Sequence, residues 1–186
     1  MPINYNNDRL LRIMAGWQAT GVRAAVILVD EDAAGPDKSG DREVRHRLQS
    51  ALLLRSQGFG VFLARYGSEG AHGQRSVFDG GLGADLDTAV PGTARVYEKG
   101  ALETDGFANV QLAADIAGGG YTEVVIMGQS TNACCAATAR GAASRGLRVH
   151  TCDSILRGGA VVTEPPVYFP GGFVGWPDDT TVYAAL

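Results

Sequence analysis

The chain has 186 residues, of which 45% are hydrophobic and 19% charged, a composition typical of a folded globular protein rather than a disordered one. This length suits a single domain, which we expect to occupy residues 1–186. The formal net charge of −4 lacks the basic excess that nucleic-acid or membrane-surface binding requires, so we expect a small-molecule substrate, and neither nucleic acid nor membrane as a partner.

Signals for export, membrane insertion and cross-linking are absent from the sequence. The first residues contain no basic segment followed by an apolar one, and no apolar run approaches the roughly 20 residues needed to cross a bilayer. The three cysteines, at 134, 135 and 152, do not form the spacing of a disulfide framework or a structural zinc site. We therefore expect a cytoplasmic protein.

Helical and strand patterns alternate in the first half of the chain. Apolar residues recur at helical spacing over 7–19, which Gly21 would end, and again over 41–57. Continuous apolar runs at 24–29 and 59–64 are typical of strands buried on both faces, as in a parallel sheet. This alternation predicts βαβ units.

Two stretches between these elements lack a regular hydrophobic period. Residues 31–40 and 66–93 are rich in Gly, Ser and Asp, so they predict loops that wall a pocket. Asp30 ends the first apolar run and is followed by Glu31 and Asp32. Ligands in open α/β sheets bind at the carboxyl ends of strands, which makes this acidic group a candidate site.

The second half continues the same alternation. The expected elements are a strand at 94–98 followed by Lys99, a helix at 107–117 ended by Gly118–Gly120, a strand at 124–127, a helix at 132–145 and a strand at 147–152.

These elements together predict an α/β fold with a doubly wound, mostly parallel sheet of about six strands and helices on both faces. The core of the fold would occupy about 22–154. Residues 155–186 combine four prolines with aromatic residues and predict an extended arm that ends in a short strand at 181–186. Because such a tail seldom packs on its own chain, we expect it to form an interface in a homo-oligomer, a dimer or a tetramer.

The turn after the strand at 124–127 carries the strongest chemical signal. The apolar run stops at Gly128, crosses a polar turn at 129–132 and enters an alanine-rich segment with Cys134 in its first turn. Unpaired N–H groups and the positive end of the helix dipole favour a thiolate there and can hold an oxyanion. Cys134 is therefore a candidate nucleophile, although the pattern alone also fits a small buried hydrophobic residue.

Other candidates have simpler explanations. Cys135 and Cys152 fit packing positions. His150 could form a dyad with a cysteine, but a histidine within a strand is more often a hydrogen-bonded core residue. Asp30 could merely cap a turn, and Lys99 is the weakest candidate taken alone, because most lysines are solvated surface charges.

The segments VDED, YEKGALETDGF and GQSTNACCAATARGAASRGLRVHTCDS resemble those of the isochorismatase-like cysteine hydrolases. This group includes nicotinamidases, N-carbamoylsarcosine amidohydrolase and ureidoacrylate hydrolases. Its pattern has a strand ending in Asp, a second strand ending in Lys with a later Phe, and a Gly-x-x-Thr-x-x-Cys turn leading into a helix with Thr-Ala. The matching positions are Asp30, Lys99, Phe107, Gly128, Thr131, Cys134, Thr138 and Ala139.

The resemblance implies a Rossmann-type three-layer α/β sandwich and a catalytic set of Asp30, Lys99 and Cys134. It also implies a cis peptide bond between Gln129 and Ser130. The backbone N–H groups of Ser130 and Cys134 would form the oxyanion hole. No cofactor is implied by these residues.

Two departures from the family pattern bear on the pocket. Glu31 and Asp32 replace an apolar residue and a glutamine, which makes the pocket floor more acidic. Nicotinamidases carry an Asp/His/His metal site after the second strand, whereas that loop here offers only His72, so we expect no metal.

We therefore expect a metal-independent cysteine hydrolase that cleaves a small amide, ureido or related C–N bond through a thioester. One alternative is an isochorismatase-type vinyl ether hydrolase, in which Asp30 performs acid/base chemistry without the thiol. Another is a catalytically silent, oligomeric binding or regulatory protein that uses the same pocket.

Overall fold

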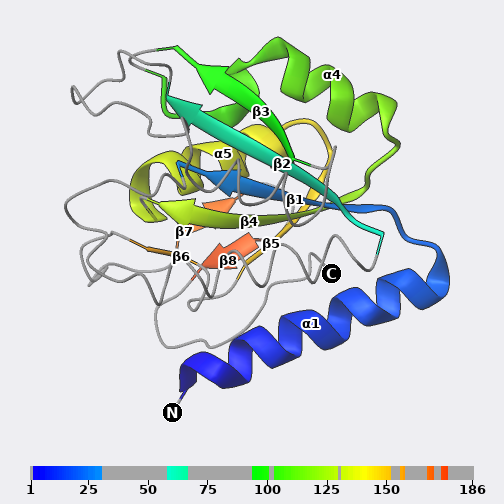
Figure 1. The fold of residues 1–186 in the computed structure, drawn as a ribbon. Helices are drawn as coiled ribbons and strands as arrows, with labels where there is room; N and C mark the ends of the chain where they lie inside the picture. The colour runs from blue at the N-terminus through cyan, green and yellow to red at the C-terminus, as the bar shows by residue number, and fades with distance from the viewer. Residues whose placement is uncertain are drawn as a thin grey trace.

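A parallel sheet forms the centre of the computed structural model (Figure 1). The structure describes residues 2–30, 58–66, 94–100, 103–129, 131–151, 156–157, 167–169 and 173–175. Within these residues the sheet has six strands in the order β3-β2-β1-β4-β5, with β6 paired to β4. Their bounds are β1 Ala24–Val29, β2 Gly60–Tyr66, β3 Ala94–Lys99, β4 Glu123–Gln129, β5 Arg148–His150 and β6 Leu156–Arg157.

All strand pairs in this sheet are parallel, which confirms the predicted doubly wound architecture. The chain runs outward from β1 through β2 to β3 and then returns to place β4 on the other side of β1. The winding therefore reverses between β1 and β4, and in such folds ligands bind at the carboxyl edge of that reversal. Asp30 directly follows β1, and the Cys134 segment follows β4.

Burial on both faces explains why the sequence of the central strand β1 is continuously apolar. All six residues of β1, Ala24–Val29, are buried, because the strand is covered on both faces. Burying a Val, Leu or Ile side chain contributes about 1.5–3 kcal/mol each. The continuous apolar run at 24–29 therefore predicts this strand correctly.

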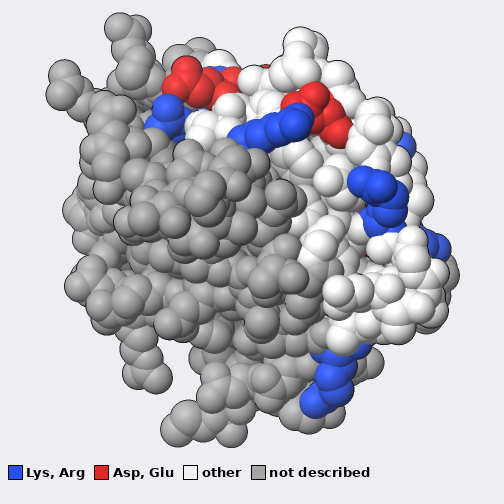
Figure 2. Space-filling model, turned by 45° about the vertical axis from the view of Figure 1, so that its right-hand side comes forward, with Lys and Arg blue, Asp and Glu red and all other residues white. Residues whose placement is uncertain are grey.

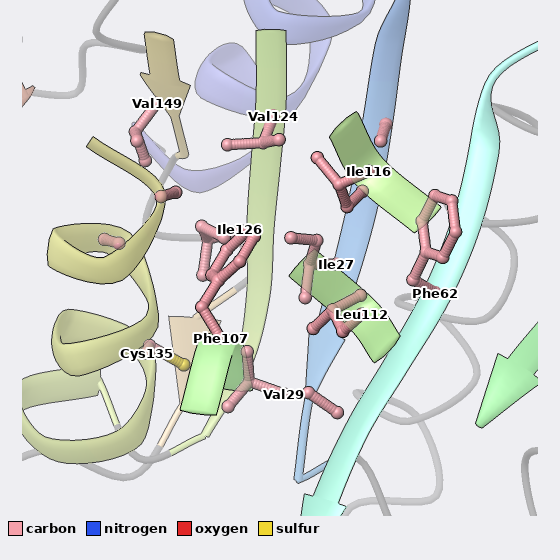
Figure 3. Close-up of a cluster of buried hydrophobic side chains, with 14 of the residues drawn as sticks. Ile27, Val29, Phe62, Phe107, Leu112, Ile116, Val124, Ile126, Cys135 and Val149 are labelled. Atoms are coloured by element: carbon pink, nitrogen blue, oxygen red, sulfur yellow. The ribbon is translucent and has the colours of Figure 1, made fainter. Parts of the chain in front are cut away.

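Helices cover both faces of the sheet (Figure 1). Helix α1, Pro2–Thr20, lies on one face, where its Trp17 ring contacts Phe59 edge-on at 6.4 Å between centroids and His150 at 4.6 Å. Helices α4, Val110–Gly118, and α5, Ala136–Ala143, cover the other face. Figure 3 shows part of that second core, in which Ile27, Phe62, Leu112, Ile116, Val124 and Ile126 pack together.

The helix expected at 107–117 is divided in the structure. A short 3-10 turn, η1, occupies Gly106–Ala108, and α4 begins only at Val110. Asn109 separates them because its backbone is extended and its side chain accepts hydrogen bonds from Gln111 N and Leu112 N, both at 3.0 Å. This is an N-cap, which hydrophobic periodicity alone does not reveal.

Several other elements begin or end at residues different from those expected. Helix α1 begins at Pro2 rather than residue 7 and ends before Gly21, whose φ of 73° suits glycine. Strand β5 is shorter than the expected 147–152. The C-terminal region contributes β6 and an antiparallel pair, β7 Val167–Phe169 and β8 Phe173–Gly175. The predicted helix at 41–57, the loops at 31–40 and from residue 67 to 93, and the strand at 181–186 lie outside the described residues.

Residue His150 is a core residue, as expected, and its partner is Glu123. Both residues are 1% exposed, and Nε2 of His150 lies 2.7 Å from Glu123 Oε2. Arg148 Nε donates to the other carboxylate oxygen at 2.6 Å. Burial alone would raise the pKa of Glu123, but the hydrogen bonds from His150 and Arg148 outweigh it and hold the pKa of this carboxyl below its ordinary value.

Replacing Glu123 with glutamine is expected to destabilise the protein by about 2 kcal/mol at neutral pH. Because the folded pKa of Glu123 is lowered, its contribution is complete above the ordinary carboxyl pKa and is lost as the pH falls through the folded value. Urea denaturation of both proteins at pH 7, 5 and 3.5 measures this. The stability gap should shrink only at the lowest pH, and a gap independent of pH would contradict the prediction.

A buried tyrosine attaches α4 to the outer strand β3. The hydroxyl of Tyr97 donates to Asp115 Oδ2 at 2.5 Å. Burial and this hydrogen bond raise the pKa of Tyr97 to about 12, so the phenol stays protonated. The contact holds the strand that ends in Lys99 against the helix that follows it.

Figure 2 shows one face of the molecule. The described Lys and Arg side chains on this face are dispersed among uncharged and acidic residues rather than gathered in one patch. Within the described part of the chain, no helix has the length and apolar character needed to cross a membrane.

Candidate active site

The carboxyl ends of β1 and β3 bring Asp30 and Lys99 into contact. Lys99 Nζ donates to Asp30 Oδ2 at 2.7 Å, and the two residues are 3% and 8% exposed. Strand β2 lies between β1 and β3, so the lysine side chain reaches past β2 to the aspartate. Lysines are rarely buried unless they are paired, because desolvation of the ammonium is costly. A buried ion pair at the carboxyl ends of the strands therefore suggests a role in function rather than in stability.

The backbone of Asp30 supplies independent support for a functional edge. Its φ of 48° makes it a non-glycine residue in the left-handed region, a conformation that costs roughly 1–3 kcal/mol and clusters at functional sites. Its N–H donates to Ala64 O of β2 at 2.8 Å. This hydrogen bond and the ion pair to Lys99 hold the carboxylate in position.

Gly128 allows β4 to approach the end of β1. It pairs with Val29 in the parallel register, and its φ is +128°. A Cβ at this position would overlap the backbone carbonyl of Val29. Only glycine fits there, which explains why the apolar run of β4 stops at this residue.

Replacing Gly128 with alanine is expected to destabilise the protein by more than about 3 kcal/mol, because a Cβ at this φ would both strain the backbone and overlap Val29. Gly118, at the end of α4, is the control, since a Cβ there meets nothing within 4 Å. Thermal unfolding of both variants tests this. Equal unfolding temperatures in the two variants would show that the close approach is absent.

Cys134 lies on the turn that joins β4 to α5. This turn, η2, spans Thr131–Cys135 and is π-helical, so the helix expected at 132–145 starts as a wider turn and becomes α-helical only at Ala136. Cys134 is 6% exposed and packs in the same cluster as Val29, the last residue of β1. Asp30 and Cys134 therefore follow neighbouring strands at one edge of the sheet.

Some of the predicted site falls outside the described residues. Ser130, and with it the predicted cis peptide and one oxyanion-hole N–H, is among them, as is the side chain of Gln129. His72 lies there as well. Among the residues that the structure does describe, no group of three or more His, Cys, Asp or Glu side chains could hold a metal ion.

Sequence reasoning missed the contact that joins η1 to α5. Thr138 Oγ1 accepts a hydrogen bond from Gly106 N at 2.9 Å, and Thr138 is fully buried. A Cβ on Gly106 would lie 2.9 Å from that of Ala64 on β2, so the contact is tight. Phe107, 1% exposed, packs in one cluster with Ile126 and Cys135 (Figure 3). The sequence features that could have indicated this contact are the Thr138-Ala139 pair in the cysteine segment and the Gly106-Phe107 pair after Lys99.

A protein-family model described as the Isochorismatase domain matches residues 37–153, which is more than half of the chain. The chain belongs to the isochorismatase family. The predicted membership of this family is thereby confirmed, over a range that includes Lys99 and Cys134, and Asp30 lies before the matched residues. No curated protein sequence matches the chain.

Solved structures show the isochorismatase-like fold in other proteins. The nicotinamidase of Staphylococcus aureus has a TM-score of 0.59 and 14% identity, over 74% of this chain and 85% of that one. The N-carbamoylsarcosine amidase of Thermoplasma acidophilum has a TM-score of 0.57 and 17% identity, over 76% and 87%. YcaC of Escherichia coli, an octameric hydrolase of unknown specificity, has a TM-score of 0.56 and 19% identity, over 73% of this chain and only 64% of its own.

Proposed function

We propose that this protein is a metal-independent cysteine hydrolase that cleaves a small amide, ureido or related C–N bond through a thioester intermediate. The observation that carries the proposal is the buried ion pair of Lys99 with Asp30, 2.7 Å long, at the sheet edge from which the Cys134 turn departs. An acid, an amine and a thiol on one edge are the groups that this chemistry requires.

In the proposed first step the carboxylate of Asp30 accepts the thiol proton of Cys134. A free thiol titrates near pH ~8.5, so only a few per cent would be ionised at neutral pH without help. The ammonium of Lys99 stabilises the negative charge while it passes between carboxylate and sulfur. Both charged groups are buried, which strengthens their interaction relative to one in water.

The thiolate then attacks the substrate carbonyl carbon and forms a C–S bond. The oxyanion accepts hydrogen bonds from backbone N–H groups of the turn, for which we propose those of Ser130 and Cys134. As the C–N bond breaks, the protonated Asp30 returns its proton to the departing ammonia or amine. Water attacks the resulting thioester with Asp30 as base, which releases the acid and restores the thiol.

The fold likeness agrees with this class of reaction, because two of the similar structures are a nicotinamidase and an N-carbamoylsarcosine amidase. The octameric YcaC structure supports a homo-oligomer for this chain as well. We propose that the aromatic and proline-rich residues 155–186 take part in its interface.

Ammonia release across a panel of amides and ureides, with and without a chelator, tests the proposal. We expect turnover of at least one carbonyl substrate that is unaffected by the chelator. Activity that disappears with the chelator and returns with a divalent metal would refute the metal-independent mechanism. Hydrolysis of a vinyl ether, with no ammonia released from any amide or ureide, would instead favour the isochorismatase-type reaction.

A further inference from the structure

The segment after Lys99 and the helix after Cys134 are joined by a set of contacts that we call the η1–α5 clasp. On one side lie Asp105, Gly106 and Phe107; on the other lie Thr138 and Gly141 of α5 and Arg145 just beyond it. Lys99 ends β3, which precedes η1 along the chain, and Cys134 lies in the turn that leads into α5, so the clasp joins the elements that follow the ammonium and the thiol.

The carboxylate of Asp105 is at the centre of the clasp. Its Oδ1 accepts a hydrogen bond from Phe107 N at 2.8 Å and so caps η1. Both of its oxygens lie where a Cβ on Gly141 would stand, so the carboxylate rests directly on the backbone of α5. Replacement of that glycine by any other residue would displace it.

The arginine of the clasp reinforces the same arrangement. Arg145 Nη1 donates to Gly141 O at 2.8 Å, and Nη2 donates to Phe107 O at 3.1 Å. The guanidinium also lies 5.1 Å from the centre of the Phe107 ring. One side chain thus bridges the backbones of α5 and η1, and the Asp105 carboxylate lies between them.

The environment of Asp105 is unusual for a simple helix cap. Burial, with the neighbouring Glu103 carboxylate, raises the pKa of the Asp105 carboxyl above its ordinary value, against the hydrogen bond from Phe107 and the positive charges of Arg145 and Lys99. An exposed serine, threonine or asparagine would cap η1 without burying a charge.

We propose that Asp105 is a positioning residue for the reaction, which fixes the Lys99 segment against the Cys134 helix and so keeps the ammonium at a constant distance from the thiol. This inference rests on the proposed function. A catalytic geometry must be held within about 0.5 Å. Strands β2 and β1 lie between β3, which ends in Lys99, and β4, which leads into the Cys134 turn, so strand pairing does not join these two segments directly.

Two replacements of Asp105 separate its hydrogen bond from its charge. Asp105→Asn keeps an oxygen that can cap Phe107 N, and Asp105→Ala does not; both remove the negative charge. The measurement is the pH dependence of iodoacetamide labelling of Cys134, with the labelled residue assigned by peptide fragmentation so that Cys135 is not confused with it.

We expect the midpoint of labelling in Asp105→Asn to lie at or below that of the wild type, because the cap is kept and one anion is removed. In Asp105→Ala it should lie about half a pH unit or more above that of Asp105→Asn, since the thiolate loses a fixed ammonium. On an amide substrate, kcat should fall about tenfold in Asp105→Ala with KM nearly unchanged. Coincident profiles for the two variants would overturn the inference.

Gly141→Ala provides a second test that keeps Asp105. It should behave as Asp105→Ala does, because the new Cβ pushes the carboxylate off α5. If Asp105→Asn folds and neither Asp105→Ala nor Gly141→Ala does, the clasp holds the fold rather than the site and the inference is wrong. A wild-type midpoint equal to that of a free thiol, with no turnover, contradicts the proposed function instead, and the comparison of the variants separates the two results.

Discussion

Replacing Cys134 with alanine is expected to reduce amide turnover by at least about 10³-fold, because loss of a nucleophile leaves only the contribution of binding and oxyanion stabilisation. The fold should survive, since the change removes a single sulfur atom from a residue that is 6% exposed. Steady-state ammonia release and circular dichroism measure the two effects.

Cys135 is the matched control for this experiment. It is the neighbouring thiol, 3% exposed and packed in the same cluster, so Cys135→Ala removes the same atom from a similar environment. It should cost some stability through a small cavity and leave most of the activity. Amide turnover that persists in Cys134→Ala would show that the thiol is not the nucleophile, and hydrolysis of a vinyl ether by this variant would favour acid/base chemistry by Asp30.

Replacing Lys99 with methionine is expected to destabilise the protein by about 3–5 kcal/mol, because it leaves the buried Asp30 carboxylate without its ammonium. Methionine matches the length of the lysine stem, so the loss comes from the charge rather than from packing. Amide turnover should fall at least about 100-fold, since the variant lacks the ammonium that stabilises the charge passing between Asp30 and Cys134.

The exposed ion pair of Arg95 with Asp115 is the control for Lys99. Its nitrogen and oxygen lie 2.9 Å apart, but the Arg95 side chain is 65% exposed, so Arg95→Met should change stability very little. Urea denaturation of the two variants at one pH compares them. If Lys99→Met were as stable as Arg95→Met, the Lys99 pair would be a surface contact and the mechanism would lose its electrostatic basis. A double variant, Lys99→Met with Asp30→Asn, should recover stability without activity.

Hydrophobic patterns predicted most of the sheet because burial on two faces requires long apolar runs. The runs at 24–29 and 124–127 each appear as a strand in the structure, with β4 extended by a few residues at its ends. Helix boundaries were less well predicted. Asn109 divides one expected helix by capping α4, and a π-helical turn begins the other. Both features depend on hydrogen bonds that hydrophobic periodicity does not describe.

The buried pair of Glu123 with His150 shows a second kind of feature that the sequence did not predict, the identity of a contact partner. The sequence favours a core histidine at position 150, which is correct, but it does not identify the carboxylate that pairs with its Nε2. Glu123 lies 27 residues away and becomes a neighbour only because β4 and β5 pair in a particular parallel register. Registers of parallel strands are set by the packing of the whole domain.

The sequence by itself determined the α/β class, the approximate positions of strands β1 to β5, and the position of Cys134 after a strand that stops at Gly128. These features depend on local patterns of burial and on glycine conformation. Only the tertiary structure decided that Lys99 pairs with Asp30, from which it is separated by 69 residues, and that Asp105 rests on the backbone of Gly141. The reason is that these contacts are made by side chains from separate strands and helices, and their distances exist only once the sheet has formed.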